Sequence, residues 1–191
     1  MPPAARPAAD SRIFVLFGPG GAGKGTIASR LTAADPRLWL SRSWTTRPQR
    51  AGEPDDAYAF VDRPAFEAKA AAGGFFEWAE YLGNLYGTPV PDPGTDRDVL
   101  LEIDLQGARH VRSLRPDATL ILLLPPSPDI QADRLRARGD DEAHVARRLA
   151  EGAAEEREGR AIADYVVVND TIAQATAELA SILDLRRSGA S

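Results

Sequence analysis

The chain has 191 residues, of which 43% are hydrophobic and 27% charged, with a formal net charge of -5 and no cysteine. This length suits one well-cored domain, and the composition is that of a folded protein. Without cysteine, disulfides, thiol catalysis and cysteine-ligated zinc are excluded. A negative net charge argues against non-specific nucleic-acid binding, and no apolar run approaches the roughly 20 residues that span a bilayer. We expect a cytoplasmic protein without nucleic-acid or membrane partners.

The first residues lead into a strand, a glycine-rich loop and a helix. Residues 1–12 are rich in proline and alanine, so we expect a flexible tail. The apolar run IFVLF at 13–17 predicts a buried strand, and the spacing of Ile27, Ala28 and Leu31 predicts a helix over 26–34.

The segment 38–97 has a different character. It contains strand-like pieces at 38–42 (LWLSR) and 57–61 (AYAFV), a helical stretch near 64–72, and a turn-rich stretch at 75–94. We expect an insert with its own small sheet, lying over the carboxyl edge of the main sheet, where ligands of such folds collect.

The remainder alternates between buried strands and helices, which predicts an α/β fold with a parallel core sheet flanked by helices. Continuous apolar runs predict strands at 99–103, 119–124 and 165–168, and helical stretches occupy 106–114, 128–138 and 142–160. We expect a single domain over 13–188, with its core at 13–37 and 98–188 and the insert at 38–97.

The stretch GPGGAGKGT at 18–26 matches the phosphate-binding pattern G-x-x-x-x-G-K-[ST] up to its lysine. In this pattern backbone N–H groups and a helix N-terminus face phosphate oxygens, and the lysine reaches the outer phosphates. The alternative is a glycine-rich turn that only links strand to helix. We predict that ATP is bound by Gly18, Pro19, Gly20, Gly21, Ala22, Gly23, Lys24, Gly25 and Thr26.

Gly25 is the exception to the pattern, because it lacks the hydroxyl that usually binds Mg²⁺ after the lysine. Thr26 is the nearest substitute. The sequence G-K-G-T at 23–26 also resembles the corresponding stretch of adenylate kinases, where Mg²⁺ is held largely by water and nucleotide oxygens. We expect Mg²⁺ as cofactor, with Thr26 acting mostly through water.

Further motifs follow in order: SRSWTTRPQRAGE from residue 41, FFEWAEYLGNLYGTP from 75, LLEIDLQGAR from 100, PPS from 125, RLRARG from 134, ARRL from 146 and VVVND from 166. Together with the loop they closely resemble guanylate kinases, nucleoside monophosphate kinases of the P-loop kinase family. The resemblance runs from about Ile13 to Leu185. It implies an enzyme of purine nucleotide metabolism that converts ATP and GMP to ADP and GDP and also accepts dGMP.

The resemblance assigns the GMP site to the insert. Glu77 would accept hydrogen bonds from guanine, and Ser43 and Thr88 would lie near its O6 atom. The phosphate would be gripped by guanidinium groups and phenols, which suit a dianion; these are Arg47, Arg50, Tyr58 and Tyr86. For Tyr86 the alternative is a packing role, and for Glu77 a solvated one.

Two carboxylates follow a predicted strand in LLEIDLQG. Glu102 and Asp104 are two residues apart, so we expect both on one face of that strand, toward the nucleotides. By resemblance Asp104 lies near the guanine and the metal's water, while Glu102 stands where the family usually has Asp. The alternative for Asp104 is helix capping.

The resemblance places a mobile lid at about 134–150. Phosphoryl transfer needs positive charge and positioning, and we predict catalytic roles for Lys24, Arg50, Arg138 and Arg148. Arg134 and Asn169 would contact ATP. Alternatively, the lid arginines pair with helical glutamates such as Glu142, Glu151 or Glu155.

Two other functions compete with guanylate kinase. A kinase with another acceptor, such as a ribose bisphosphate, should lack Glu77 together with Ser43 and Thr88. A non-catalytic interaction domain should have lost the phosphate loop.

The chain also has three prolines between Gly87 and Asp98, where the family has a helix. We expect ATP and GMP as small-molecule partners, and a monomer or homodimer.

Overall fold

The computed structural model describes residues 11–49, 53, 55, 57–81, 83–90 and 96–189, and for residues 77, 79 and 81 the backbone alone. Of the tail predicted at 1–12, residues 1–10 lie outside the described residues, as do Arg50 and most of the proline-rich stretch before Asp98. The last two residues of the tail are held by the fold: Ser11 is buried, and the backbone N–H of Arg12 donates to Asp98 at 3.1 Å.

Five strands of the described chain form a parallel sheet. These are β1 (Ile13–Phe17), β2 (Leu38–Ser41), β7 (Asp98–Glu102), β8 (Thr119–Leu124) and β9 (Tyr165–Val168). Their order is β2-β7-β1-β8-β9, which puts β1 in the centre. Val15 of β1 lies opposite Leu101 on one side and Leu120 on the other. The predicted α/β class with a parallel core sheet is confirmed.

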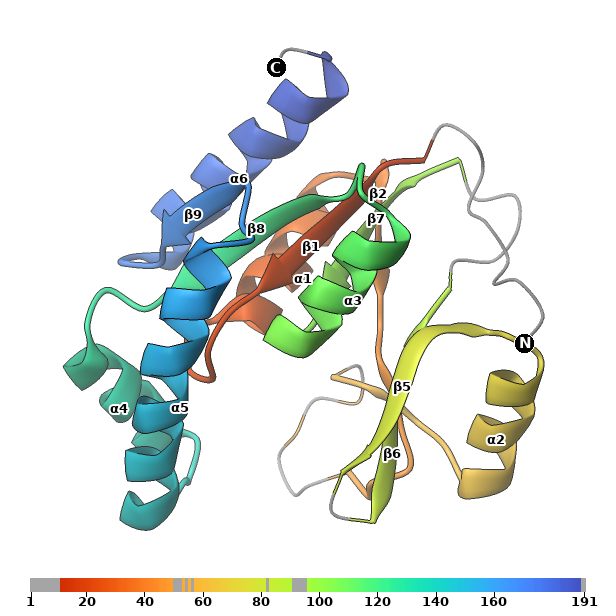
Figure 1. The fold of residues 1–191 in the computed structure, drawn as a ribbon. Coiled ribbons are helices and arrows are strands. Elements are labelled where there is room, and N and C mark those ends of the chain that lie inside the picture. Colours follow the sequence, from red (N-terminus) through yellow and green to blue (C-terminus); the bar gives the residue numbers. More distant parts are fainter. Residues whose placement is uncertain are drawn as a thin grey trace.

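Helices cover both faces of this sheet (Figure 1). On one face α1 (Lys24–Ala34) and α6 (Ile172–Arg187) pack on Phe14, Leu16 and Leu123. On the other face α3 (Leu105–Leu114) and α5 (Glu142–Arg160) pack on Phe17 and Leu122. The strands β1 and β8 are buried along their whole length, because apolar side chains on both faces need cover.

Two strands differ from expectation. Leu38–Ser41 was assigned to the insert, but it pairs in parallel with β7 as an edge of the main sheet. The run YVVV was expected to be covered on both faces, yet β9 is the opposite edge and exposes Val166 and Val168. Side chains alternate between the two faces of a strand: Val167 is buried against α6, whereas Val166 and Val168 point to the other face, which is left exposed at this edge. An apolar run alone does not reveal this.

A second sheet occupies the segment 44–89. Its described strands are β3 (Trp44–Thr45), β4 (Ala59–Phe60), β5 (Phe75–Tyr81) and β6 (Asn84–Pro89), in the order β4-β3-β6-β5. The stretch expected to be turn-rich is therefore an antiparallel hairpin, β5 with β6. Helix α2 (Arg63–Ala71) covers the sheet with Phe66, which stacks on Phe75 at 4.5 Å between ring centroids.

The hairpin approaches α2 closely at Gly87. A Cβ at this position would lie 2.9 Å from both Phe66 and Phe75. Only glycine fits between these rings, so this residue lets the small sheet close over its own hydrophobic cluster of Phe66, Phe75 and Leu85.

Helix α4 (Pro128–Ala137) packs against α5 beyond the carboxyl end of the main sheet. Figure 1 shows this helix pair on one side of the end of β1 and the β5–β6 hairpin on the other. The helices predicted at 26–34, 64–72, 106–114, 128–138 and 142–160 are confirmed to within two residues at each end. Helix α6 was not predicted.

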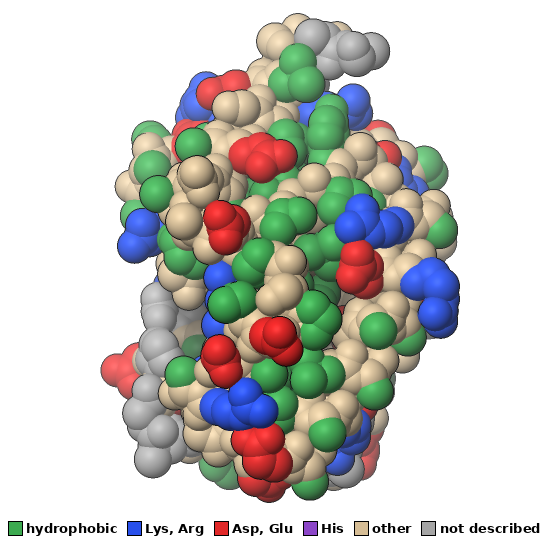
Figure 2. All heavy atoms as spheres, turned by 90° about the vertical axis from the view of Figure 1, so that its left-hand side faces the viewer, with side chains coloured by type: hydrophobic (Ala, Val, Ile, Leu, Met, Phe, Trp, Pro, Cys, Tyr) green, Lys and Arg blue, Asp and Glu red, His purple; other side chains and the backbone are tan. Residues whose placement is uncertain are grey.

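The surface around the β9 edge carries apolar side chains among acidic and basic ones (Figure 2). Within the described residues, no helix is both long enough and apolar enough to span a membrane.

Candidate active site

The glycine-rich loop connects β1 to α1 at the carboxyl end of the main sheet. Gly18 has φ 140°, and a Cβ there would lie 2.2 Å from the carbonyl oxygen of Leu123. Gly21 and Gly23 have φ 83° and 93°. Glycine is favoured at these positions because L side chains rarely adopt such backbone conformations. The loop thus leaves the sheet in a tight turn and ends at the N-terminus of α1.

Asn169 supports this loop from beneath. Its side chain is fully buried, and its Nδ2 atom donates to the carbonyl oxygen of Ala22 at 2.7 Å. Its backbone oxygen accepts from Arg134 Nη2 at 3.0 Å. Both residues were predicted to contact ATP, and the structure brings both to the loop. A buried Asn169 side chain holds the loop and is closed off from solvent.

Lys24, the first residue of α1, folds back onto the loop. Its Nζ atom donates to the carbonyl oxygens of Gly18 at 2.6 Å and Pro19 at 3.1 Å. Burial lowers the pKa of Lys24, because desolvation disfavours the ammonium form, while the nearby carboxylates of Glu102, Glu155 and Asp104 oppose that shift. The ammonium group therefore sits among carboxylates at the loop.

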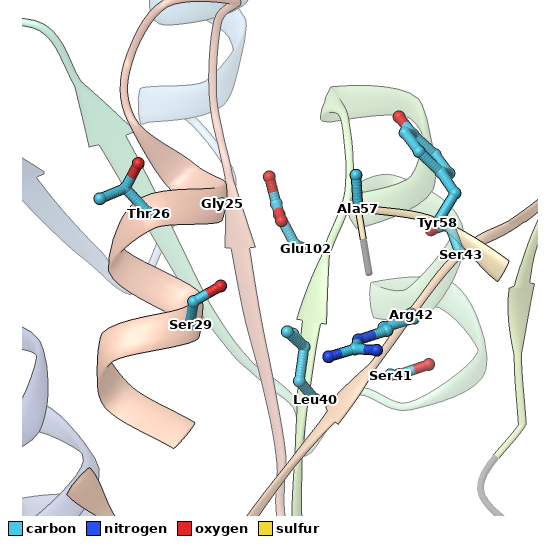
Figure 3. Close-up of a pocket in the computed structure, with 10 residues that line it drawn as sticks. All are labelled: Gly25, Thr26, Ser29, Leu40, Ser41, Arg42, Ser43, Ala57, Tyr58 and Glu102. Carbon is cyan, nitrogen blue, oxygen red and sulfur yellow. The ribbon is translucent and has the colours of Figure 1, made fainter. Parts of the chain in front are cut away.

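Glu102, the last residue of β7, faces the first turn of α1. A Cβ on Gly25 would lie 3.4 Å from each of its carboxylate oxygens. Burial raises the pKa of Glu102, and the charges of Lys24 and Arg138 counteract part of that rise. Figure 3 shows the carboxylate between α1 and the segment that carries Tyr58.

A cavity of about 360 Å³ lies between α1, β2, β7 and the start of the small sheet, with Glu102 on its wall. Its wall is formed by Gly25, Thr26, Ser29, Leu40, Ser41, Arg42, Ser43, Ala57, Tyr58 and Glu102. Within the described part of the chain, no group of three or more His, Cys, Asp or Glu residues is placed to hold a metal ion. The oxygen donors on the wall are Thr26, the serines, Tyr58 and Glu102, and oxygen is the ligand that Mg²⁺ prefers. Figure 3 shows Thr26 on the opposite side of α1 from Glu102.

A cluster of one arginine and two tyrosines lies on the small sheet. The Arg47 guanidinium carbon is 5.6 Å from the centre of the Tyr58 ring, and the rings of Tyr58 and Tyr86 are 6.3 Å apart. Arg47 also forms a bidentate ion pair with Glu53, at 3.0 and 2.8 Å. Burial raises the pKa of Tyr58, so it remains a phenol that can donate to an anion. The structure thus brings together three of the four residues predicted to grip a phosphate, and Arg50 lies outside the described residues.

The residues predicted to read a base are only partly described. Ser43 is half-buried on the cavity wall, and Thr88 is buried in β6. Glu77 lies opposite Thr88 in the register of the hairpin, and its side chain lies outside the described residues.

Asp104 departs from its expected place on a strand. Strand β7 ends at Glu102, and Asp104 is the N-cap of α3, where its Oδ1 atom accepts from Gly107 N at 2.8 Å. The two carboxylates therefore do not share a strand face, because the chain turns into a helix at once. The capping alternative is confirmed for Oδ1, and Asp104 still lies within electrostatic range of Lys24.

The predicted lid arginines come from α4 and α5. Arg138 ends α4 and is exposed, with its charge acting on Lys24 and Glu102. Arg148 lies against the loop, since a Cβ on Gly20 would be 3.8 Å from its Cδ atom. Its Nη1 atom is 3.5 Å from Glu151, so the helical ion pair predicted as the alternative exists in weak form.

Three residues at this site were not predicted as site residues from the sequence. Gln131 of α4 donates from Nε2 to the carbonyl oxygen of Gly20 at 2.7 Å. Glu155 of α5 is half-buried beside Lys24 and Arg148, and burial raises its pKa. Glu53 pairs with Arg47. The helical spacing of the buried glycines 152 and 159 marks the face of α5 that approaches the loop and the sheet, and Glu155 shares it.

The relationship of the chain to known proteins agrees with this geometry. The family model for guanylate kinase matches residues 10–186. This chain belongs to the guanylate kinase family. It is 47% identical over 184 residues to the guanylate kinase of Synechococcus sp. strain CC9902, covering 93% of this chain and 97% of that one. It is 46% identical over 179 residues to that of Symbiobacterium thermophilum, covering 90% and 83%.

Solved structures show the same relationship. The guanylate kinase of Anaplasma phagocytophilum superposes with a TM-score of 0.69 at 32% identity, covering 93% of this chain and 87% of that one. A shikimate kinase from Acinetobacter baumannii superposes with a TM-score of 0.54 at 15% identity, which shows a shared fold. Like its family, the protein is a phosphotransferase enzyme of the P-loop kinase fold.

Proposed function

We propose that this protein transfers the γ-phosphoryl group of ATP to GMP, giving ADP and GDP. The observation that carries the proposal is a cavity whose wall includes Gly25 and Thr26, the two residues after Lys24, together with Ser43 and Tyr58 of the segment that bears the small sheet. A donor and an acceptor can thus meet at one sheet edge, where the ligands of open α/β sheets bind.

On the donor side, residues 18–26 would hold the ATP phosphates with backbone N–H groups and the N-terminus of α1. Lys24 would exchange its two carbonyl partners for phosphate oxygens. Arg134 would border the adenine or the phosphates, whereas the buried Asn169 would act on ATP through the loop that it supports.

On the acceptor side, Arg47, Arg50, Tyr58 and Tyr86 would grip the GMP phosphate. Binding would require Arg47 to share or exchange its ion pair with Glu53. Guanine would be read by Glu77, Ser43 and Thr88, with Asp104 nearby, and dGMP would be accepted as well. The segment 38–97 would serve as the GMP-binding insert; its first strand, β2, is an edge of the main sheet.

The lid would comprise about residues 134–150. Its closure would bring Arg138 and Arg148 onto the transferring phosphoryl group and exclude water that would otherwise hydrolyse ATP. Arg148 already lies against Gly20, so a short movement would suffice for this guanidinium. Catalysis then requires no covalent enzyme intermediate, since positioning and positive charge stabilise the transferring phosphoryl group.

Mg²⁺ would lie beside the Glu102 carboxylate on the oxygen-rich wall of the cavity, with water and nucleotide oxygens as most of its ligands. When bound, Mg²⁺ supplies charge neutralisation at the phosphate oxygens. Glu102 would orient its water shell from this side of α1, and Thr26, which lies on the other side of the helix, would act only through water.

We further propose that the enzyme acts in the cytoplasm on these small molecules, without nucleic-acid or membrane partners, as a monomer or homodimer.

An acceptor panel tests the proposed reaction. ADP release is measured with ATP and Mg²⁺, offering GMP, dGMP, AMP, UMP and ribose phosphates in parallel. We expect turnover with GMP and dGMP. Turnover with a ribose phosphate in place of GMP would favour the other kinase, and GMP binding without turnover on any acceptor would favour an interaction domain.

A further inference from the structure

Gln131 is a buried polar residue at the junction of three elements. It is 5% exposed on α4, and its Nε2 atom donates to the Gly20 carbonyl oxygen at 2.7 Å. A Cβ on Gly21 would lie 3.2 Å from its Cγ atom, and one on Gly152 of α5 would lie 3.0 Å from Nε2. The amide is therefore enclosed by the loop, by α5 and by its own helix.

This hydrogen bond fixes the direction of a peptide group in the loop. The described chain contains no cis peptide bonds, so the N–H of Gly21 points opposite to the C=O of Gly20. Gln131 draws that C=O toward α4, and the N–H of Gly21 then points away from α4. Asn169 acts in the same way on the peptide between Ala22 and Gly23, because its side chain donates to the C=O of Ala22.

A phosphate loop depends on this orientation. Its N–H groups must face the anion, so its carbonyl groups must face outward, and an outward carbonyl that is buried needs a donor. Without Gln131, the peptide between Gly20 and Gly21 is free to turn, which would present a carbonyl oxygen to the phosphates instead of an N–H.

We propose that Gln131 is a positioning residue for ATP: it holds the Gly20–Gly21 peptide with its N–H toward the phosphates and ties that peptide to the helix pair α4 and α5. The inference rests on the proposed function. The link to α5 follows from the contact of Gly20 with Arg148 and of Gln131 with Gly152. The same side chain thus contacts both the loop and α5, the helix that carries Arg148.

Nucleotide binding without GMP tests this role independently of turnover. In Gln131→Glu the shape is kept and the donor is replaced by a carboxylate; in Gln131→Met the hydrogen bond is lost without a new charge. We expect both variants to bind ADP and ATP about tenfold or more weakly than the parent, as measured by calorimetry, and Gln131→Glu to bind them more weakly than Gln131→Met. The affinity for GMP should stay within about twofold of the parent. Gln174→Glu, at an exposed position on α6, should change neither.

The Gly21 amide gives a direct signature. In the parent protein, ADP should shift the Gly21 N–H resonance strongly downfield, and this shift should be lost in Gln131→Met. Gly152→Ala, whose new methyl would displace the Gln131 amide, should weaken ADP binding in the same direction and serves if the residue 131 variants fail to fold. ADP affinity within about twofold of the parent in folded Gln131→Met, or a loss confined to Gln131→Glu, would overturn the inference. If the parent bound ADP through Gly21 but did not phosphorylate GMP, the proposed function would fail and the positioning role would stand.

Discussion

The carboxylate of Glu102 occupies the space beside Gly25, with both of its oxygens 3.4 Å from where a Cβ of residue 25 would lie. The position after the loop lysine thus has no hydroxyl, but a carboxylate from the neighbouring strand lies against it. That carboxylate also raises the pKa of Lys24 against the opposing effect of burial. This relationship leads to two predictions.

Glu102→Gln should move the alkaline limit of activity to lower pH. Without this negative charge, the pKa of Lys24 falls further below its usual value, and the ammonium group needed at the phosphates is lost earlier as pH rises. The measurement is kcat/KM for ATP between about pH 6 and 10. Glu178→Gln, on the exposed face of α6, should leave the profile unchanged. An unchanged profile in Glu102→Gln would show that Glu102 does not act on Lys24.

Gly25→Ala should be tolerated. The methyl group would meet the Glu102 oxygens at an ordinary contact distance, and alanine favours the helix over glycine. We expect a gain of about 0.5 kcal/mol in the free energy of unfolding and GDP formation within about threefold of the parent. A loss of activity of about a hundredfold would mean that the reaction does not tolerate a methyl group between residue 25 and Glu102.

Gly87→Ala should impair GMP binding and leave ADP binding unchanged. The new methyl would lie 2.9 Å from Phe66 and Phe75, so the rings must move apart, at a cost of about 1–3 kcal/mol. Because Gly87 adjoins Tyr86 and Thr88, we expect the KM for GMP to rise while ADP binding stays as in the parent. Equal losses for both nucleotides would contradict a separate role for the small sheet.

Stability at low pH should depend on the ion pairs of Arg187. This side chain at the end of α6 is mostly buried and contacts Asp35 and, at 2.7 Å, Asp98. Hydrogen bonds from Arg37 and Arg187 hold the pKa of Asp35 well below its usual value. The stability that Asp35 contributes is therefore complete above about pH 4 and is lost as pH falls through the lowered pKa.

Arg187→Ala tests these ion pairs. We expect the free energy of unfolding to fall by about 2–4 kcal/mol at neutral pH, because the partly buried Asp35 and Asp98 both lose a guanidinium partner, although Asp35 keeps Arg37. Arg160→Ala removes an exposed pair with Glu156 and should cost less than about 1 kcal/mol. Similar losses in both variants by chemical denaturation would contradict the assignment.

The sequence predicted the centre of the fold better than its edges. Runs such as TLILLL are buried on both faces, so composition alone identifies them. β2 was placed in the wrong sheet, because a strand of four residues of mixed character does not indicate which strand it pairs with. The β5–β6 hairpin was missed because Gly83 between the strands, Gly87 within β6 and Pro89 at its end suggested turns.

The candidate site was predicted where a motif carries chemistry in consecutive residues. The loop ends in Lys24 at the start of α1, and Arg47, Tyr58 and Tyr86 lie together on the small sheet; their roles stay predictions. Gln131 was missed because a glutamine in a helix is an ordinary surface residue until its burial is known. Asn169 was predicted to contact ATP, but its position beneath the loop depends on a contact across 147 residues of sequence.

The most direct test compares GDP formation by the parent protein and by Lys24→Ala, with ATP, Mg²⁺ and GMP at saturating concentrations. GMP binding is measured alongside by calorimetry. The account predicts GDP and ADP in equal amounts from the parent, a loss of about a thousandfold or more in Lys24→Ala, and similar GMP affinity for both. Near-normal GDP formation by Lys24→Ala would contradict a reaction centred on this loop.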